Sequence, residues 1–312
     1  MFGNPDLGNL RVVLINGSPL FCSNVDFYPK QEMDPVELLQ GGPRTLIYSI
    51  GKKTFEGTLS IPLYVDTDGN IAEPCKEVIR CADNPLRSLS LTMNYGIMGE
   101  PLTADLYQSP LSTDSHKRLT LGCCYIQKLT ITVENAGPIT MEVSIIGLPD
   151  DENEDDYDVD VPTEGLMARQ CSFADCIIRS GADGSYVYWE NIQEFNLSFE
   201  NKVEPLYLVT QSKRDYADYL LAGETHIFGE WTEIKKAEEW DDEKGQWKHG
   251  GYFDDFYLKI KIADIVADIR DIVMKPQSQP LGVGILKRKT EFIVTFRHGW
   301  VSETRNLVFS DL

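Results

Sequence analysis

The sequence predicts a mainly β protein, and three observations support this fold class. Apolar and polar residues alternate with a period of two in at least seven segments, whereas helical periodicity is confined to short stretches. Hydrophobic residues make up 42% of the chain and charged residues 25%, which is the composition of a folded protein. Because alternation places each apolar set on one face, we expect antiparallel sheets with one dry and one wet face.

The alternating segments are spread along the whole chain, and mostly serine, threonine, asparagine and lysine occupy their intervening positions. Their apolar members are Leu59, Ile61 and Leu63; Leu89, Leu91, Met93 and Tyr95; Leu129, Ile131 and Val133; Met141, Val143 and Ile145; Phe195, Leu197 and Phe199; Leu258, Ile260 and Ile262; and Phe292, Val294 and Phe296. At the wet positions, Glu134, Glu142, Glu194 and Glu200 suggest an acidic face, which Lys128, Lys259 and Lys261 interrupt.

Helices are expected in few places. Residues 73–81 carry Pro74 near a plausible first helical position and apolar groups at helical spacing, so a short helix is predicted there. A second helix is predicted over residues 212–221, with Ser212 as N-cap and Gly223 as the stop. Residues 264–274 fit either a helix or a strand, because their isoleucines are β-branched.

A chain of 312 residues is long enough for two domains. The predicted division is a first domain at 1–150 with an N-terminal arm, an acidic linker at 151–164, and a second domain at 165–312 with an insert near 235–253. The acidic block cannot pack without neutralisation, so it is interpreted as a solvated linker or exposed loop, with a lumen-facing or hinge role. A calcium site is the alternative, but the block lacks the glycine and terminal glutamate of an EF-hand loop. Its acids are Asp150, Asp151, Glu152, Glu154, Asp155, Asp156, Asp158 and Asp160.

Two pairs of similar segments lie on either side of this block. Residues 125–135 match 191–201 at an offset of 66, with Ile-Gln and Glu-Asn shared, which suggests a duplicated strand that ends in a turn. A weaker match pairs 55–60 with 228–232, and chance alternation explains it equally well. The two matches differ in offset, so they exclude an exact tandem repeat and leave two related domains with altered element order.

Charge and cysteine content exclude several classes of protein. With 29 basic and 49 acidic residues the net charge is −20, which argues against gripping nucleic acid through its phosphates. An acidic wall is compatible with DNA sliding past, although excess acid also serves solubility alone. The seven cysteines include no Cys-x-x-Cys pair and are interpreted as buried thiols, with cross-links between subunits as the alternative.

The sequence predicts a protein that is not an enzyme. No P-loop, nucleophile elbow or zinc-type spacing occurs, so catalytic residues, cofactors and metal ligands are all expected to be absent. The apolar runs are too short for a membrane span, and no secretory signal is visible, which indicates synthesis in the cytoplasm.

Several segments in order resemble the two-domain tail tube, or major tail, proteins of tailed bacteriophages. In the first half these are Gly57–Leu63, the short helix, Leu89–Tyr95, Gly122–Ile131 and Thr140–Gly147. In the second half they are Ile192–Asn201, Pro205–Tyr207 and Gly223–Trp231. The likeness covers most of residues 45–300 and rests on pattern and order. It implies two tandem β-sandwich or barrel domains, each with a short flanking helix.

The resemblance implies a structural protein that self-assembles into stacked rings around an acidic lumen for viral DNA. A duplicated chain would form a ring of three subunits with pseudo-sixfold symmetry, and a single-copy chain a ring of six. The implied location is the virion tail, after synthesis in the host cytoplasm. Implied partners are further copies and tape measure, sheath or terminator proteins, while double-stranded DNA passes without specific binding. Segments 1–45 and 66–73 and the acidic block are expected between stacked rings.

The insert near 235–253 departs from a minimal tube domain. It is interpreted as an outer decoration, a hairpin or a contact between rings, and its aromatic residues are candidates for contacts between subunits. These residues are Trp240, Trp247 and Tyr252. The alternative function for the whole chain is a carbohydrate-binding or adhesin-like β-sandwich protein.

Overall fold

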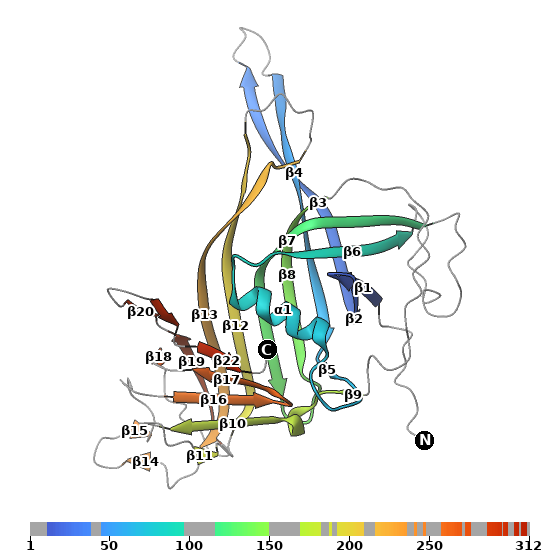
Figure 1. Ribbon diagram of the computed structural model, residues 1–312. Helices are drawn as coiled ribbons and strands as arrows, with labels where there is room; N and C mark the ends of the chain where they lie inside the picture. The colour runs from blue at the N-terminus through green and yellow to red at the C-terminus, as the bar shows by residue number, and fades with distance from the viewer. Residues whose placement is uncertain are drawn as a thin grey trace.

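The protein is mainly β, with antiparallel sheets and one α-helix in the part of the chain that the structure, a computed structural model, describes (Figure 1). The described residues are 11–38, 45–96, 116–149, 169–181, 187–188, 192–208, 216–235, 240–241, 246–247, 257–269, 272–275, 286–294, 296–298, 303–305 and 307–310.

The first half contains nine strands and the α-helix. They are β1 (Arg11–Ile15), β2 (Ser18–Cys22), β3 (Asn24–Leu38), β4 (Thr45–Pro62), β5 (Tyr64–Val65), α1 (Glu73–Asp83), β6 (Leu89–Gly96), β7 (His116–Glu134), β8 (Thr140–Pro149) and β9 (Arg169–Gln170).

The described part of the second half begins with a 3-10 turn, η3 (Phe173–Asp175), and its other described elements are strands. They are β10 (Cys176–Gly181), β11 (Val187–Tyr188), β12 (Ile192–Leu206), β13 (Tyr219–Lys235), β14 (Trp240–Asp241), β15 (Gln246–Trp247), β16 (Tyr257–Ile262), β17 (Ile265–Ile269), β18 (Ile272–Met274), β19 (Leu286–Val294), β20 (Phe296–His298), β21 (Glu303–Arg305) and β22 (Leu307–Ser310).

The main sheet has eleven strands and branches at β7. One edge of β7 pairs with β8, which leads on through β4 to β3. The other edge pairs with β6 along residues 116–124, and with β12 along residues 128–134. Beyond β12 the sheet continues through β13 and β19 to β18. An uninterrupted ribbon of eight strands therefore runs β3-β4-β8-β7-β12-β13-β19-β18.

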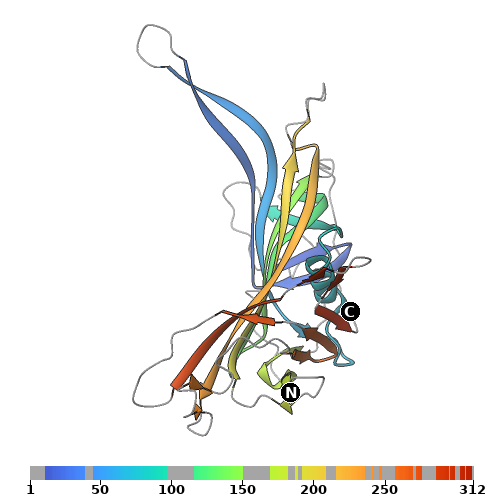
Figure 2. The ribbon, with the colours of Figure 1, turned by 90° about the vertical axis from the view of Figure 1, so that its left-hand side faces the viewer.

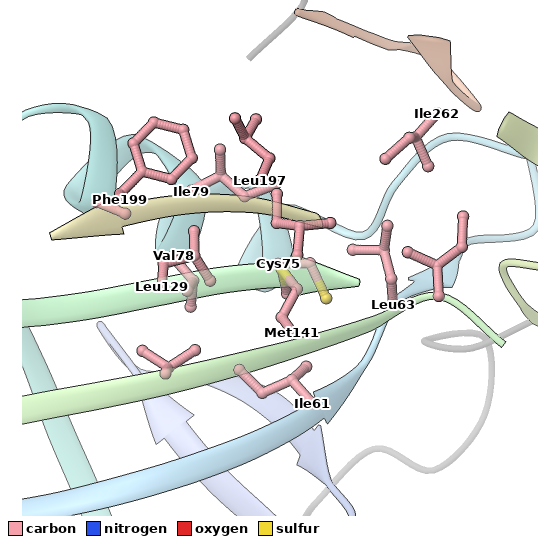
Figure 3. Packing of buried hydrophobic residues seen from close by; sticks show 14 of the residues in the cluster. Ile61, Leu63, Cys75, Val78, Ile79, Leu129, Met141, Leu197, Phe199 and Ile262 are labelled. Carbon is pink, nitrogen blue, oxygen red and sulfur yellow. The ribbon is translucent and has the colours of Figure 1, made fainter. Parts of the chain in front are cut away.

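A second layer covers one face of this ribbon. Over the first half it consists of α1 with β6, β1 and β2, and over the second half of the five-stranded sheet β11-β10-β16-β17-β22 (Figure 1). Both halves share one contiguous apolar core, in which Ile79 of α1 and Leu197 of β12 lie close together (Figure 3) and line one cavity with Ile262 of β16. The cavity at this place has a volume of about 20 Å³ and apolar walls, so it holds one water molecule at most.

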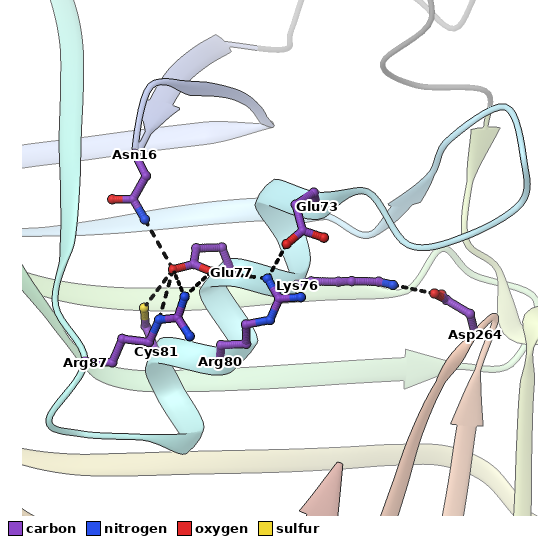
Figure 4. Close-up of polar contacts among 8 residues, drawn as sticks. All are labelled: Asn16, Glu73, Lys76, Glu77, Arg80, Cys81, Arg87 and Asp264. Atoms are coloured by element: carbon purple, nitrogen blue, oxygen red, sulfur yellow. Dashed lines mark hydrogen bonds and ion pairs between the residues drawn. The ribbon is translucent and has the colours of Figure 1, made fainter. Parts of the chain in front are cut away.

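The predicted helix at 73–81 is confirmed, and its sequence explains its position. Pro74 lies in the first turn, where a missing N–H costs nothing, and Cys75, Val78 and Ile79 are buried on one side. On the outer side Glu77 accepts hydrogen bonds from Arg87 and from Asn16 in the turn between β1 and β2 (Figure 4). The helix is thereby fixed to the β1–β2 hairpin.

The partly buried carboxylate of Asp264 connects the second layer of the second half to α1 in the first half. Asp264, in the turn between β16 and β17, accepts hydrogen bonds from the Ile71 N–H at 2.7 Å and from Lys76 Nζ at 2.5 Å (Figure 4). Burial acts to raise the pKa of Asp264, but these two donors lower it below the usual range. The ionised form of Asp264 is therefore the one that the fold stabilises.

The eight-stranded ribbon contains the same arrangement of four strands twice. In chain order the first set is β3, β4, β7, β8 and the second is β12, β13, β18, β19, and each is arranged first-second-fourth-third across the sheet. Both second strands carry a glycine at which an added Cβ would overlap an aromatic ring: Phe27 at Gly57, and Phe292 at Gly229.

A register irregularity also recurs at the matching place. Between Gln31 and Met33 of β3, the partner strand β4 advances by three residues instead of two, from Lys53 to Ile50. The β12–β13 pair does the same between Asn201 and Val203, opposite Thr225 and Ala222. Counted from the residues that face the two glycines, Phe27 and Leu197, both irregularities begin four positions on.

The structure corrects one predicted helix and decides between two alternatives that the sequence left open. The helix expected at 212–221 is wrong over its described part, because β13 begins at Tyr219 and runs extended as the partner of β12. Of the two alternatives left open for residues 264–274, the described part adopts strands, which are β17 at Ile265–Ile269 and β18 at Ile272–Met274. The described second half therefore has the short η3 turn in place of the flanking α-helix that was predicted for each domain.

The two pairs of similar segments also acquire different meanings. The stronger match joins β7 to β12, which are antiparallel neighbours in non-equivalent positions of the two four-strand sets. The weaker match, 55–60 with 228–232, falls on β4 and β13, the equivalent second strands, and includes both glycines. Alternating apolar residues occur in most strands, so the stronger sequence match, 125–135 with 191–201, joined two strands in non-equivalent positions.

We predict that Gly57→Ala and Gly229→Ala each destabilise the protein by about 1–3 kcal/mol, because the new methyl group needs space that an aromatic ring occupies. Urea unfolding measures this loss, and Gly137→Ala is the control, since its nearest neighbour would lie 3.5 Å from the new Cβ. Phe27→Leu should restore part of the stability of Gly57→Ala. Equal stability of all three glycine variants would contradict the prediction.

We predict that Asp264→Ala lowers the free energy of unfolding at pH 7 by about 1–3 kcal/mol, because the Ile71 N–H and Lys76 lose their acceptor. The folded-state pKa of Asp264 is depressed, so this stabilisation is present above pH 4 and is lost as pH falls through the folded pKa. Unfolding curves of both proteins between pH 7 and 2 should converge toward acid. A difference that stays constant across this range contradicts the assignment.

Candidate functional site

The face of the ribbon opposite the core is mainly polar, and we call it the polar face, although Tyr28, Phe228, Val273 and Ile293 also lie on it. Its residues alternate along each strand with buried apolar ones, so the pattern is the one read from the sequence. It is defined by Asp26, Lys30, Glu56, Thr58, Ser60, Lys128, Thr130, Thr132, Glu134, Glu142, Ser144, Glu194, Asn196, Ser198, Glu200, Glu230, Thr232, Lys275, Lys287, Lys289 and Glu291.

Side-chain contacts connect this face from one edge of the ribbon to the other. They include Lys30–Glu56 and Ser60–Glu142 in the first set of strands, and Asn196–Glu230 and Lys289–Glu230 in the second. Thr130 and Ser198 hydrogen-bond at 3.0 Å across the junction of β7 and β12. The polar face is therefore a single surface, and the junction between the halves does not divide it.

Carboxylates outnumber cations on the polar face. It carries eight carboxylates, Asp26, Glu56, Glu134, Glu142, Glu194, Glu200, Glu230 and Glu291, and five lysines, Lys30, Lys128, Lys275, Lys287 and Lys289. The four glutamates singled out in the sequence all lie here, whereas Lys259 and Lys261 belong to β16 in the other sheet. The face therefore has an excess of three carboxylates, and its interrupting lysines are mostly other ones than the sequence pattern indicated.

The β7–β12 junction places two glutamates opposite each other. Glu134 pairs with Glu194 across the two strands, and both side chains are exposed. Thr232 donates a hydrogen bond to Glu194, which leaves both negative charges in place. Like charges directly opposite each other destabilise a sheet, so the fold tolerates this pair at a cost.

Ion pairs occupy the second strand set near the end of the ribbon. The Lys275 ammonium donates a hydrogen bond to Glu291 and holds the pKa of that carboxyl below its usual value. Glu230 raises the pKa of Lys289 in the same way. Lys30 makes the equivalent contact with Glu56, at 2.9 Å, at the opposite end.

The two ends of the ribbon are sheet edges without a second partner strand among the described residues. β3 pairs with β4 alone, and β18 with β19 alone. The Leu63 N–H donates to the Ile139 carbonyl, so odd-numbered residues of β4 point their backbone groups toward β8 and even-numbered ones toward β3. In β3 it follows that, up to the irregularity at Gln31, the odd-numbered residues present theirs to the open edge. One of them is Pro29, which has no N–H to offer.

The hairpin of β12 and β13 extends beyond the ribbon and crosses to the first half. The Ala217 N–H donates to the Lys53 carbonyl of β4 at 3.0 Å, and the Tyr216 ring stacks on Phe55. Val203 and Leu220 form a small separate core beneath it with Ile146 of β8. Figure 2 shows this hairpin and the β3–β4 hairpin projecting from the same end of the sheet.

The tip region of the β12–β13 hairpin exposes large apolar side chains. Tyr207, Leu208, Tyr219 and Leu221 are each 40–58% exposed. Single exposed apolar residues are ordinary on a protein surface. Four within one hairpin form an apolar surface that suits a contact with another protein.

Several residues predicted from the sequence lie outside the described residues. These are Tyr252 and the acids Asp150, Asp151, Glu152, Glu154, Asp155, Asp156, Asp158 and Asp160. Trp240 and Trp247 are described and pair with each other as the β14–β15 hairpin, one of the three forms considered for the insert.

The remaining chemical features are few. All seven cysteines are free thiols, and five of them are buried, in agreement with the sequence interpretation. Within the described ranges, no group of three or more His, Cys, Asp or Glu side chains is placed to hold a metal ion. No helix in that same part of the chain is long and apolar enough to cross a bilayer.

Comparison with known proteins finds no family model that matches the chain and no similar curated protein. The functional argument therefore depends on the polar face and the two open edges. Sequence reasoning missed the part that Asp26, Glu56, Glu230 and Glu291 play in this face. Their positions alternate with buried residues, and that signal becomes readable only when the strand register is known.

We predict that Glu134→Gln raises the stability of the isolated protein by about 0.2–1 kcal/mol, because it removes one of two opposed negative charges. The gain should shrink when the salt concentration rises from about 0.01 to 1 M, since ions screen exposed charges. Denaturant unfolding at both salt concentrations measures it, and Glu224→Gln, an exposed glutamate outside the junction, is the control. A loss of stability in Glu134→Gln would show that the carboxylate has a favourable partner.

Proposed function

We propose that the protein is a structural subunit of a phage-type tail tube, which assembles into stacked rings around a conduit for viral DNA. The observation that carries the proposal is the doubled four-strand set within one open ribbon, with a complementary edge at each end. In the covalent chain, the third-position strand of the first set, β7, pairs with the first-position strand of the second, β12. β18 and β3 are the strands in those same two positions that have no such neighbour among the described strands.

The rotation and translation that would superimpose the first four-strand set on the second can be applied again to place further copies of the chain. Every strand in the ribbon is antiparallel to its neighbours, so a step of four strands preserves strand direction. β18 of one copy can therefore pair with β3 of the next copy in the same antiparallel way as β7 pairs with β12 within the chain. Closure into a ring also removes sheet edges that would otherwise invite uncontrolled pairing.

The register supports a closed cylinder. The row of paired residues through Gly229 runs through Leu197, Ile131 and Met141 to Ile61, which lies four residues beyond the equivalent glycine, Gly57. A shift of four residues is about 13 Å along the strands for about 19 Å across four strands, which is a tilt of about 35°. Closed β-barrels have strand tilts of about 35–45°.

The polar face is assigned to the lumen. The opposite face is covered by α1 and the five-stranded sheet, which leaves the polar face as the one that can line a bore. Its carboxylates repel a polyanion and outnumber its lysines, and Lys30, Lys275 and Lys289 are each paired with a glutamate, so duplex DNA passes without being held. With eight strands in each copy, three copies give a backbone cylinder about 45 Å across at a spacing of about 4.8 Å and this tilt, wide enough for hydrated DNA.

The proposal includes the virion tail as location, and tape measure, sheath or terminator proteins as neighbours. The β3–β4 and β12–β13 hairpins project from one end of the ribbon, which suits contact with the next ring of a stack (Figure 2). The exposed Tyr207, Leu208, Tyr219 and Leu221 supply apolar surface there. The function is geometric and electrostatic, without turnover of a substrate.

We predict that the purified protein forms rings or hollow tubes at high concentration, which negative-stain microscopy detects. In tubes, Glu200→Cys on the polar face should react with a bulky PEG-maleimide at least about tenfold more slowly than Lys261→Cys on the exposed surface of β16, because the reagent reaches a lumen only through the ends. In dispersed monomers the two thiols should react at similar rates.

Two outcomes contradict the proposal. Dispersed monomers that bind glycans on an array favour the carbohydrate-binding alternative. Tubes in which both thiols react equally fast remove the polar face from the lumen. The reaction of the wild-type protein supplies the background from Cys123 and Cys176, which are the partly exposed native cysteines.

A further inference from the structure

We infer that the seam between two copies has a defined register, in which Lys275 of one copy lies directly opposite Lys30 of the next. This inference rests on the proposed function and adds the contact by which the rings close. It follows from the way the chain pairs its own two strand sets.

The equivalence of residues is fixed by the two glycines. In the first set the row of paired residues is Phe27, Gly57, Ile145 and Ile126, across β3, β4, β8 and β7. In the second set the row is Leu197, Gly229, Phe292 and Met274, across β12, β13, β19 and β18. The matching backbone irregularities in β3–β4 and β12–β13 support the same alignment independently.

The seam pair is found by moving along the strands from these two rows to equivalent positions. Lys128 of β7 pairs with Ser144, one residue before Ile145, and the Lys275 N–H donates to the carbonyl of Glu291, one residue before Phe292. Lys128 and Lys275 are therefore equivalent. Three residues beyond Leu197 lies Glu200, and three beyond Phe27 lies Lys30, so these two are equivalent as well. Because Lys128 pairs with Glu200 inside the chain, Lys275 pairs with Lys30 between copies.

Each lysine of this pair forms an ion pair with a glutamate of the neighbouring strand in its own copy. Lys30 contacts Glu56 at 2.9 Å and Lys275 contacts Glu291 at 2.9 Å, so the row across the seam reads Glu56, Lys30, Lys275, Glu291. Each lysine is about half exposed in the single copy. Lysine on an edge strand discourages pairing with arbitrary partners, and neutralisation by an inner carboxylate lets the one correct partner approach.

The backbone geometry makes the seam testable by cross-linking. Backbone groups of Lys30 point toward β4 and those of Lys275 toward β19, so the seam pair is of the non-hydrogen-bonded kind. In antiparallel sheets the Cα atoms of such a pair lie about 4.5 Å apart, within the range that a disulfide bridges. Pro29 removes one N–H from the adjoining ladder, so the seam is weaker than the β7–β12 junction.

The test uses the full chain with Lys30→Cys and Lys275→Cys together. Under mild oxidation of assembled material, non-reducing electrophoresis should show a covalent ladder that ends at the ring size and forms several-fold faster than in the control. The control is Asp26→Cys with Lys275→Cys, which is on the same face but about 13 Å out of register. Mixing the two single variants, Lys30→Cys and Lys275→Cys, should give a disulfide dimer and no ladder.

The outcomes separate this inference from the proposed function. Tubes seen by microscopy without a ladder, or with an equally fast ladder in the control, overturn the register and leave the tube function standing. Protein that neither assembles nor cross-links overturns both. Circular dichroism of the double variant checks folding, and the mixed single variants give a second measurement if the double variant misfolds.

Discussion

The structure depends on β7 pairing along both of its edges. One edge holds β8, and the other is shared end to end by β6 and β12, so a single strand belongs at once to the first layer, the second layer and the other half of the chain. From Lys128 onward its odd-numbered residues Leu129, Ile131 and Val133 face the core and its even-numbered residues face outward. Because side chains alternate with a period of two, a slip of one residue would turn the apolar set toward solvent, and burial therefore fixes the register.

A fixed register gives the polar face its character. Glutamates from β7, β8, β12, β13 and β19 lie on one surface because the paired stretches that carry them, between the register irregularities, keep their alternation in step. The retained pair of Glu134 and Glu194 shows that this surface is not optimised for stability alone. Proteins commonly accept such local cost where a surface has a task, and the proposed acidic conduit is a task of that kind.

The sequence predicted the fold class and most of the strands, because alternation and burial are local signals. It also predicted α1, since Pro74 and the buried Cys75, Val78 and Ile79 mark a helix without reference to the rest of the chain. The helix expected at 212–221 failed because the apparent helical spacing of Tyr216, Tyr219 and Leu220 was overridden by pairing of β13 with β12, a contact that local pattern does not encode. The candidate site was predicted in part: four glutamates were recognised, but the lysines of β16 could not be separated from them until the strands were assigned to sheets.

The crossing of the β12–β13 hairpin onto β4 has a mechanical consequence. Tyr216 stacked on Phe55 and the Ala217–Lys53 backbone bond connect the far end of the second half to the first, at a point distant from the β7–β12 junction. Two separated attachments resist hinging where one alone would act as a pivot. In the proposed tube, subunits of this kind would keep each ring circular when a force acts across the tube. Bending of the tube along its axis would then occur at the contacts between stacked rings.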